Sequence, residues 1–382
     1  MTTPVPVPPV SGPSSTPPPA SAAHPSRTAD GAPWRDGFRS SGQSPGSAVR
    51  TLHLIGPGLV GRAFLAQLGE LPLRVVAVSD SSATVFAREG LPLPELQAHK
   101  AAGRSLAAFA RAEAIPTELA IRIVGADLVV DATPSSPAGT DSAVARVRAA
   151  LQNDAHIVLS GKNALAAAAG EWLLGPARDR IHLHAVLGGT GQSLRRELGE
   201  LREHCRSVAL VGNVTTTRLI EAIEAGRSLA DGIAAAQAAG VLEPDPTLDL
   251  DGTDAATKLR IVHGAVFGGG PLGTPLPSFA SIARDDLRTL DPDLVRARHA
   301  RGTTTRLVAR SDRRGCQWSV RFEELPRTSP LAAPPDRVVY GYELPAGLRV
   351  HTGLAVGHHA TAGALRADVV LALQALGTEV RS

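Results

Sequence analysis

The segment from residue 242 to residue 258 places five carboxylates ahead of a single lysine. They are Glu243, Asp245, Asp249, Asp251 and Asp254, and the lysine is Lys258. A buried lysine beside carboxylates can transfer a proton, because its pKa responds to both desolvation and neighbouring charge. Such carboxylates would also suit a substrate that carries an ammonium group. On a solvated surface, however, an ion pair of this kind contributes only about 0.3–0.5 kcal/mol. Residue types alone leave both interpretations open.

A loop followed by a helix must position these side chains. Pro244 and Pro246 exclude a regular helix at the start of the segment, so we expect a loop there. A helix is predicted from Asp254 onward. Asp254 and Lys258, four positions apart, would share one face of that helix. Upstream, residues 208–226 predict a strand, a turn and a helix, and residues 228–240 predict a further helix.

A second segment of chemical interest lies near the start of the predicted folded region. Residues 52–55 predict a short buried strand, and a helix is predicted after Gly61. Between them stands Gly56-Pro57-Gly58-Leu59-Val60-Gly61, which fits the G-x-G-x-x-G pattern of dinucleotide-binding turns. Gly56 permits the tight turn, Gly58 admits a pyrophosphate and Gly61 allows close helix packing, while the helix N-terminus offers N–H groups to phosphates. We therefore predict that residues 56–61 contact NAD or NADP.

The next predicted strand, residues 73–80, ends in Asp80, 19 residues after Gly61. An acidic side chain at this place would bind both ribose hydroxyls of NAD and repel the 2′-phosphate of NADP. The alternative is an ordinary residue at the end of a strand. Ser81, Ser82 and Arg62 would still suit NADP, so the sequence does not decide between the two cofactors.

Strands and helices go on alternating after Asp80. Strands are predicted over residues 126–133, 156–162 and 181–189, with a helix over residues 142–151. This alternation predicts an α/β fold with a doubly wound parallel sheet. Thr133 and Ser135 follow a strand at the edge where such sheets bind ligands, so they would line a nicotinamide pocket or form a simple turn.

Composition excludes several classes of protein. The 39 basic residues nearly balance 36 acidic ones, which argues against a nucleic-acid-binding surface. No apolar run reaches the roughly 18 residues of a membrane span. Cys205 and Cys316 form neither a disulfide framework nor a metal-ligand pattern, so we expect no metal, and we expect both to be buried in a reducing cytoplasm. Residues 1–48 are rich in proline and serine and are predicted to be disordered, or to be a proline-rich ligand for a partner.

The acidic segment resembles homoserine dehydrogenase. The family motif E-x-D-P-x-x-D-x-x-G-x-D-x-x-x-K is complete here, from Glu243 to Lys258. The order of the glycine pattern, "DATPSS", "SGKNAL" and this motif also matches the family, and the resemblance covers roughly residues 50–375.

The resemblance implies a fold and a domain division. Residues 49–181 would form a Rossmann nucleotide-binding domain, completed by residues 350–382 with a helix over 361–376. Residues 182–349 would form an α+β substrate-binding domain with a mixed sheet, which also makes a homodimer.

The resemblance also implies a reaction in amino-acid biosynthesis, the reversible reduction of L-aspartate 4-semialdehyde to L-homoserine. Lys258 would be the acid/base group, and Asp254 would orient it. Glu243 and Asp249 would hold the ammonium or hydroxyl of this small amino-acid substrate, with Thr215 nearby. Lys162 would reach the substrate and the cofactor, although the family order of asparagine then lysine is reversed here.

Other departures from the family lie around the substrate. The turn usually written N-G-T-T-N-Y reads Asn213-Val214-Thr215-Thr216-Thr217-Arg218, and Gln192 replaces a proline. Two interpretations remain: drift within a homoserine dehydrogenase, or an oxidoreductase adapted to another amino-acid semialdehyde or hydroxy amino acid. A nucleotide-binding sensor without turnover is a third, which an intact lysine and aspartate disfavour. His358 and His359 are expected to support the site residues or to contact the cofactor rather than bind a metal, because no third ligand is spaced for them.

Overall fold

The computed structural model describes residues 49–135, 137–238, 242, 245–268, 276–354 and 357–380. The predicted tail, residues 1–48, and Glu243 lie outside the described residues. No helix in the described ranges is long and apolar enough to cross a bilayer.

The first half of the chain forms a six-stranded sheet with strand order β3-β2-β1-β4-β5-β6. All neighbouring strands pair in parallel except β2 and β3. The strands are β1 (Arg50–Ile55), β2 (Leu73–Ser79), β3 (Thr84–Phe86), β4 (Leu128–Asp131), β5 (His156–Leu159) and β6 (Ile181–His182). The helices of this part are α1 (Leu59–Ala66), α2 (Leu93–Ala101), α3 (Thr117–Val124), α4 (Thr140–Gln152) and α5 (Asn163–Leu174). The reversal of strand order beside β1 is the hallmark of a doubly wound sheet, and it confirms the predicted fold class.

Strand β6 is much shorter than the strand predicted over residues 181–189. After His182 the backbone turns, with Gly188 and Gly189 at φ 57° and 84°. The N–H of His184 donates to the Asp368 carboxylate at 2.7 Å instead of joining the sheet. Most of the apolar side chains of residues 183–189 are therefore buried in a turn and do not belong to a strand.

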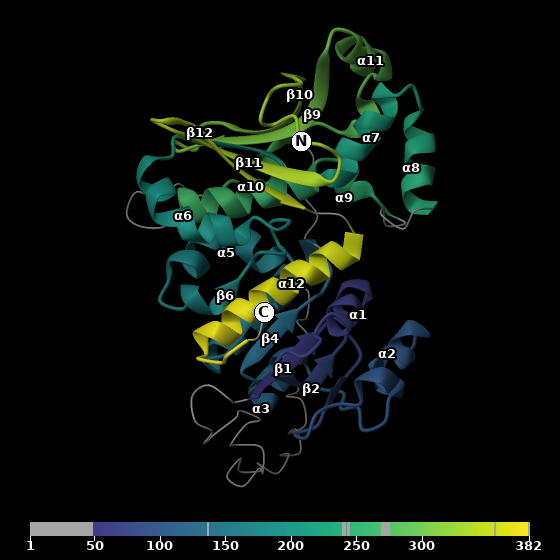
Figure 1. Ribbon diagram of the computed structural model, residues 1–382, viewed down its shortest axis with the longest axis vertical. Helices are drawn as coiled ribbons and strands as arrows, with labels where there is room; N and C mark the ends of the chain where they lie inside the picture. The colour runs from purple at the N-terminus through teal and green to yellow at the C-terminus, as the bar shows by residue number, and fades with distance from the viewer. Residues whose placement is uncertain are drawn as a thin grey trace, which may run out of the picture.

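The second half forms another six-stranded sheet, with order β12-β11-β7-β9-β10-β8. Its pairs are antiparallel except β10 with β8, so the sheet is mixed as predicted. The strands are β7 (Ser207–Val211), β8 (Ala283–Arg284), β9 (Thr303–Asp312), β10 (Trp318–Pro326), β11 (Arg337–Leu344) and β12 (Gly347–Leu354). The helices are α6 (Gly191–His204), α7 (Val214–Glu224), α8 (Leu229–Ala238), α9 (Thr247–Leu250), α10 (Thr253–Val266) and α11 (Pro292–Ala300). Helices α6 and α10 lie between this sheet and the first one (Figure 1).

The chain returns to the first sheet through α12 (Gly357–Ala375), which crosses in front of β4 and beside α1 (Figure 1). Leu365 and Val369 of this helix are fully buried in the same core as Phe64 and Leu128. Burying side chains of this size contributes about 1.5–3 kcal/mol each. The C-terminal segment is therefore an integral layer of the nucleotide-binding part.

Candidate active site

Lys258 lies near the start of α10 and is almost completely buried, with 9% of its surface exposed. Its Nζ donates to Asp254 Oδ2 at 2.8 Å and to the Gly212 carbonyl oxygen at 2.5 Å. Gly252 opens the helix in the left-handed conformation, at φ 74°. The predicted common helical face is therefore present, and the pair is buried rather than solvated.

Asp254 joins two lysines from different parts of the fold. Besides Lys258, its carboxylate lies 3.3 Å from Lys162 Nζ and accepts from Asn213 Nδ2 at 3.2 Å. Burial opposes ionisation of Asp254, but the two ammonium groups outweigh it and hold the pKa of this carboxyl below its usual value. The site thus contains an ionised carboxylate shared between two cations.

Lys162 reaches this carboxylate from the nucleotide-binding part. It immediately precedes α5, and its backbone N–H donates to Ser135 Oγ at 2.9 Å. Gly161 packs against Thr133, the second residue after β4, because a Cβ on it would lie 3.2 Å from the Thr133 carbonyl oxygen. The reversed lysine–asparagine order therefore still places an ammonium group at Asp254.

Asp249 supplies a second carboxylate beside the first. Asn213 bridges the two, donating from Nδ2 to Asp249 Oδ1 at 2.8 Å while its Oδ1 caps α7 by accepting from the Thr216 N–H at 2.8 Å. Burial and the negative charge of Asp254 both raise the pKa of Asp249, and a hydrogen bond from Thr215 counters them. A cation brought next to Asp249 would relieve this unfavourable charge.

Asn213 and Gly212 are site residues that we did not predict. A Cβ on Gly212 would lie 2.9 Å from Leu210 Cδ1 and 3.2 Å from Lys258 Cδ. The missing side chain therefore makes room for the lysine whose ammonium the Gly212 carbonyl accepts. The signal in the sequence was a glycine–asparagine pair directly after a strand.

The segment around Asp249 was predicted to be a loop, but part of it is helical. Residues Thr247–Leu250 form the single-turn helix α9 after Pro246. Proline is compatible with the position before a helix, since it has no N–H to lose there. This turn allows the Asp249 carbonyl to accept from Thr216 Oγ1 at 2.9 Å.

The glycine-rich turn has the features of a dinucleotide site. Gly56 has φ 83°, and a Cβ there would lie 2.9 Å from Thr133 N. Gly61 is packed against the Gly56 carbonyl, whereas nothing lies within 4 Å of a Cβ built on Gly58. Leu59, the first residue of α1, is 63% exposed. The open side at Gly58 fits a pyrophosphate approaching the helix N-terminus.

A continuous set of contacts joins the glycine turn to Lys258. Gly56 packs against residue 133, and Gly161 packs against the same residue. Lys162 follows Gly161 and pairs with Asp254, which pairs with Lys258. The Thr133 hydroxyl itself donates to Asp131 at 2.6 Å and accepts from Arg146 at 3.0 Å, so its predicted role at the nicotinamide stays a prediction.

Asp80 follows β2 at the predicted place, but its carboxylate is already engaged. Oδ2 accepts from Lys100 Nζ at 2.6 Å and from the Leu106 N–H at 2.9 Å. Oδ1 accepts from the Ser82 N–H and hydroxyl at 2.8 and 2.6 Å. Although burial opposes it, this set of donors holds the pKa of Asp80 well below its usual range. Because a carboxylate offers about four acceptor positions, binding of a ribose by Asp80 stays a prediction that requires exchange of these bonds.

Lysine occurs only three times in the chain, at positions 100, 162 and 258. Each is paired with a carboxylate of a predicted site: Asp80 for Lys100, and Asp254 for the other two. Apart from histidine, all other cationic side chains are arginines, whose guanidinium groups do not lose a proton in proteins. The three lysines therefore lie where proton transfer and ribose binding are predicted.

Several residues that depart from the family pattern have hydrogen-bond partners of their own. Arg218 donates from Nε to the Pro335 carbonyl at 3.0 Å, and Thr217 is buried with its hydroxyl on the Asn213 carbonyl. Gln192 donates to Asp368 at 3.3 Å. Of the two cysteines, Cys205 is buried as predicted, but Cys316 is exposed because it lies in the turn between β9 and β10.

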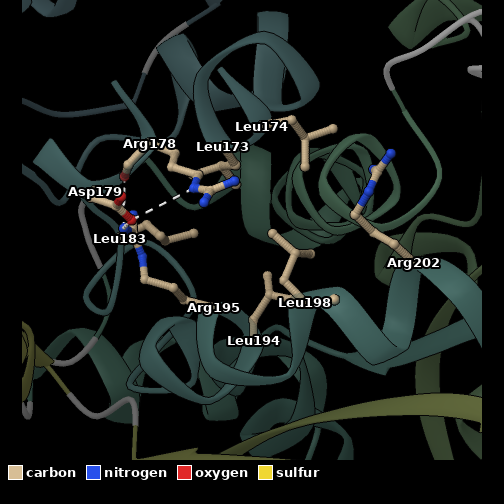
Figure 2. Close-up of a pocket in the computed structure, with 10 residues that line it drawn as sticks. Leu173, Leu174, Arg178, Asp179, Leu183, Leu194, Arg195, Leu198 and Arg202 are labelled. Atoms are coloured by element: carbon tan, nitrogen blue, oxygen red, sulfur yellow. Dashed lines mark hydrogen bonds and ion pairs between the residues drawn. The ribbon is translucent and has the colours of Figure 1, made fainter. Parts of the chain in front are cut away.

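A cavity of about 590 Å³ lies at the other end of α5, away from the lysine pair. Leu173, Leu194 and Leu198 line it, and Arg178, Arg195 and Arg202 surround them (Figure 2). Arg195 and Arg202 are held by backbone carbonyl oxygens, those of Arg178 and Ala265 among them. These arginines thus have structural partners, and the chemistry-bearing residues lie elsewhere.

Comparison with known sequences points to one family. The sequence model of homoserine dehydrogenase matches residues 194–370, and that of glutamate/leucine/phenylalanine/valine dehydrogenase matches residues 44–175. A homoserine dehydrogenase of Neisseria gonorrhoeae is 30% identical over 61% of this chain and 54% of its own length. An NAD(+)-dependent homoserine dehydrogenase of Pseudomonas canavaninivorans is 27% identical over 55% of this chain and 64% of its own length. The chain thus spans about half the length of the Neisseria relative.

Solved structures share the whole fold. A hyperthermophilic archaeal homoserine dehydrogenase mutant in complex with NADPH has a TM-score of 0.66 at 24% identity, covering 85% of this chain and 98% of its own. The homoserine dehydrogenase of Thermoplasma acidophilum has a TM-score of 0.64 at 24% identity, covering 85% and 99%. At 24% identity these structures show a shared fold, and the evidence for the family comes from the sequence matches. Together with the complete motif that ends at Lys258, these sequence matches indicate the homoserine dehydrogenase family.

Proposed function

We propose that this protein is an NAD(P)-dependent homoserine dehydrogenase that interconverts L-homoserine and L-aspartate 4-semialdehyde. The observation that carries the proposal is the Lys162–Asp254–Lys258 arrangement, in which Lys258 is buried and its two partners are partly buried, joined by packed residues to a glycine turn suited to a dinucleotide. Relatives named as NAD(+)-dependent or solved with NADPH support either cofactor. A bound nicotinamide supplies or accepts the hydride of the reaction.

Lys258 is proposed to move the proton. In the reducing direction its ammonium donates to the aldehyde oxygen while hydride reaches the adjoining carbon, and in the oxidising direction its amine takes the hydroxyl proton of homoserine. Asp254 fixes the position of the Lys258 side chain through the 2.8 Å hydrogen bond. Lys162 contacts the substrate oxygen side by side with Lys258. A positioned acid/base group of this kind accounts for about 10²–10⁴ of a rate enhancement.

The substrate's own ammonium is proposed to bind at Asp249, with Thr215 alongside and Glu243 as a further ligand. A positive charge there would favour ionisation of Asp249, whose pKa is raised by burial and by Asp254. Homoserine is proposed in preference to another hydroxy amino acid because Asp254 and Lys258 of the family motif keep their hydrogen bond, whereas the unusual residue Arg218 donates to the Pro335 carbonyl.

A homodimer through the second sheet is part of this proposal. Edge strand β12 carries Leu348 and Leu354, which are 47% and 53% exposed. Leu348 Cδ1 would lie 3.1 Å from a Cβ on Gly341 of β11, which places it over the outer face of the sheet. Light scattering coupled to size exclusion tests this, with a mass of two chains expected and a mass of one chain contradicting it.

Initial rates with homoserine and either nucleotide test the proposed reaction. Reduction of NAD or NADP, with homoserine preferred to longer and shorter hydroxy amino acids, is expected. A clear preference for another hydroxy amino acid would assign a different substrate to the same chemistry. Tight nucleotide binding without turnover on the whole panel would instead indicate a sensor.

A further inference from the structure

Tyr340 places a buried hydroxyl in the neighbourhood of Lys258, and the proposed reaction makes no use of it. The residue lies on β11, is 1% exposed, and its Oη has no hydrogen-bond partner among the described residues. Leaving a buried hydroxyl unpaired costs about 1–3 kcal/mol. Since nearly all buried polar groups are paired, a partner is expected in the working protein.

Gly212 lies close to both the Tyr340 hydroxyl and the Lys258 side chain. A Cβ on Gly212 would lie 3.2 Å from Lys258 Cδ and 3.8 Å from Tyr340 Oη, so both groups lie on the same side of Gly212. Strand pairing explains the approach, because Tyr340 pairs with Leu210 on β7, two residues before Gly212. The tyrosine also lies within the field of Asp254, which adds to the effect of burial in raising the pKa of its hydroxyl.

Lys258 has a donor to offer this hydroxyl. An ammonium group carries three N–H bonds, and among the described residues Nζ of Lys258 uses them on two acceptors, Asp254 and Gly212. An unpaired hydroxyl and an ammonium with a remaining donor therefore occupy the same buried region. We propose that Tyr340 is a positioning residue for Lys258, its hydroxyl accepting a hydrogen bond from the ammonium through one water molecule.

This inference rests on the proposed function, since it assigns Tyr340 to the lysine that is proposed to move the proton. A hydrogen bond accepted from the ammonium stabilises its charged form relative to the neutral amine. Loss of the tyrosine oxygen should therefore alter the surroundings of the Lys258 ammonium group and the pH profile of the reaction that it serves. The other titratable groups facing Lys258 are Asp254 on α10, Lys162 before α5 and Asp249 on α9. All three remain in a Tyr340→Phe variant, so the change isolates the hydroxyl.

The chain offers a matched control for this variant. Its two tyrosines are Tyr340 and Tyr342, on the same strand, and both hydroxyls are buried without a partner among the described residues. Tyr342 packs beside His351, with ring centroids 4.9 Å apart, rather than beside Lys258. Tyr342→Phe thus removes an equivalent oxygen at a place where the proposal assigns no function.

Lysine-selective NMR gives a readout that does not depend on activity, because the chain has three lysines. Tyr340→Phe is expected to shift the side-chain resonance of Lys258 and to leave those of Lys100 and Lys162 in place, whereas Tyr342→Phe should leave all three in place. The pH profile of kcat should likewise shift in Tyr340→Phe and stay unchanged in Tyr342→Phe. An unmoved Lys258 resonance in Tyr340→Phe, or an equal shift in both variants, would overturn the proposal.

Incorporation of 3-fluorotyrosine keeps the test valid should Tyr340→Phe fold poorly. The two tyrosines give two fluorine resonances, which Tyr342→Phe assigns. Lys258→Met is expected to shift the Tyr340 resonance and leave that of Tyr342 in place, and an unmoved Tyr340 resonance would contradict the pairing. A protein that shows these shifts but does not oxidise homoserine would refute the proposed function and leave the pairing intact.

Discussion

Asp254→Asn tests the shared carboxylate, because it removes one negative charge from between two ammonium groups with little change of shape. The N–O distances are 2.8 Å to Lys258 and 3.3 Å to Lys162. At an effective dielectric constant of about 20, each pair attracts by about 5–6 kcal/mol before the cost of desolvation. Breaking a buried pair by removing one partner costs about 3–5 kcal/mol. We therefore expect the free energy of unfolding to fall by about 3–5 kcal/mol.

The pH of the measurement follows from the pKa of Asp254. Since that pKa is held below its usual value, the stabilisation is complete above the unfolded-state pKa of about 3.9 and is lost as the pH falls through the folded-state value. Denaturant unfolding at pH 7.5 thus measures the full effect. Turnover should fall at least about 10²-fold, because loss of the anion removes the hydrogen bond that orients Lys258.

Asp251→Asn is the control for this experiment. Asp251 belongs to the same acidic segment, and its Oδ1 accepts from the Thr253 N–H at 2.9 Å, a bond that asparagine can also accept. It should change the unfolding free energy by less than about 0.5 kcal/mol. If Asp254→Asn were as stable and as active as Asp251→Asn, the reasoning about the buried carboxylate would be wrong.

Three further predictions follow from charges outside the proton-transfer site. Lys100→Met removes the cation that neutralises Asp80, so the ratio of kcat/KM for NAD over NADP should rise about tenfold in initial-rate assays, and an unchanged ratio would separate Asp80 from cofactor choice. Burial raises the pKa of Asp368 to about 7, so its contribution to stability is present at low pH and lost as the pH rises through 7. Between pH 5 and pH 8.5 the unfolding free energy of Asp368→Asn should therefore rise by about 2 kcal/mol relative to that of the wild type. A difference that stays constant with pH would contradict this. Burial lowers the pKa of His53 and of His182 to about 3, so each costs about 1.4 kcal/mol of stability per unit as the pH falls below 6.5, and denaturant titrations at pH 6 and pH 4 should differ by about 5 kcal/mol from these two residues.

Much of the fold could be predicted because its signals are local. One contiguous segment contains a strand, the glycine turn at residues 56–61 and a helix. The residues that make this unit pack together therefore lie next to one another in the sequence. The four-residue spacing of Asp254 and Lys258 likewise determines a common helical face without knowledge of the rest. Residues 181–189 were mistaken for a strand because an apolar run does not reveal that Asp368, far along the chain, binds the backbone N–H of His184.

The parts of the site that were missed depend on contacts distant in sequence. Gly212 accepts from Lys258 and Asn213 bridges two carboxylates only because β7 ends against α9 and α10. The engagement of Asp80 by Lys100 could not be predicted, since Lys100 comes from a helix after the next strand. Spacing patterns identify residues on one element, whereas partners from other elements require the packed structure.

Chemical rescue of Lys258→Ala is the most direct test of the proton-transfer role. Substituting alanine for a side chain that is 9% exposed leaves a cavity beside Asp254 that admits a small amine. We predict that kcat for homoserine oxidation falls at least about 10²-fold, that added methylamine or ethylamine restores part of it, and that the rescue rate follows the basicity of the amine. A variant that retains turnover within a few fold of the wild type, with no response to added amines, would contradict the assignment of Lys258 as the acid/base group.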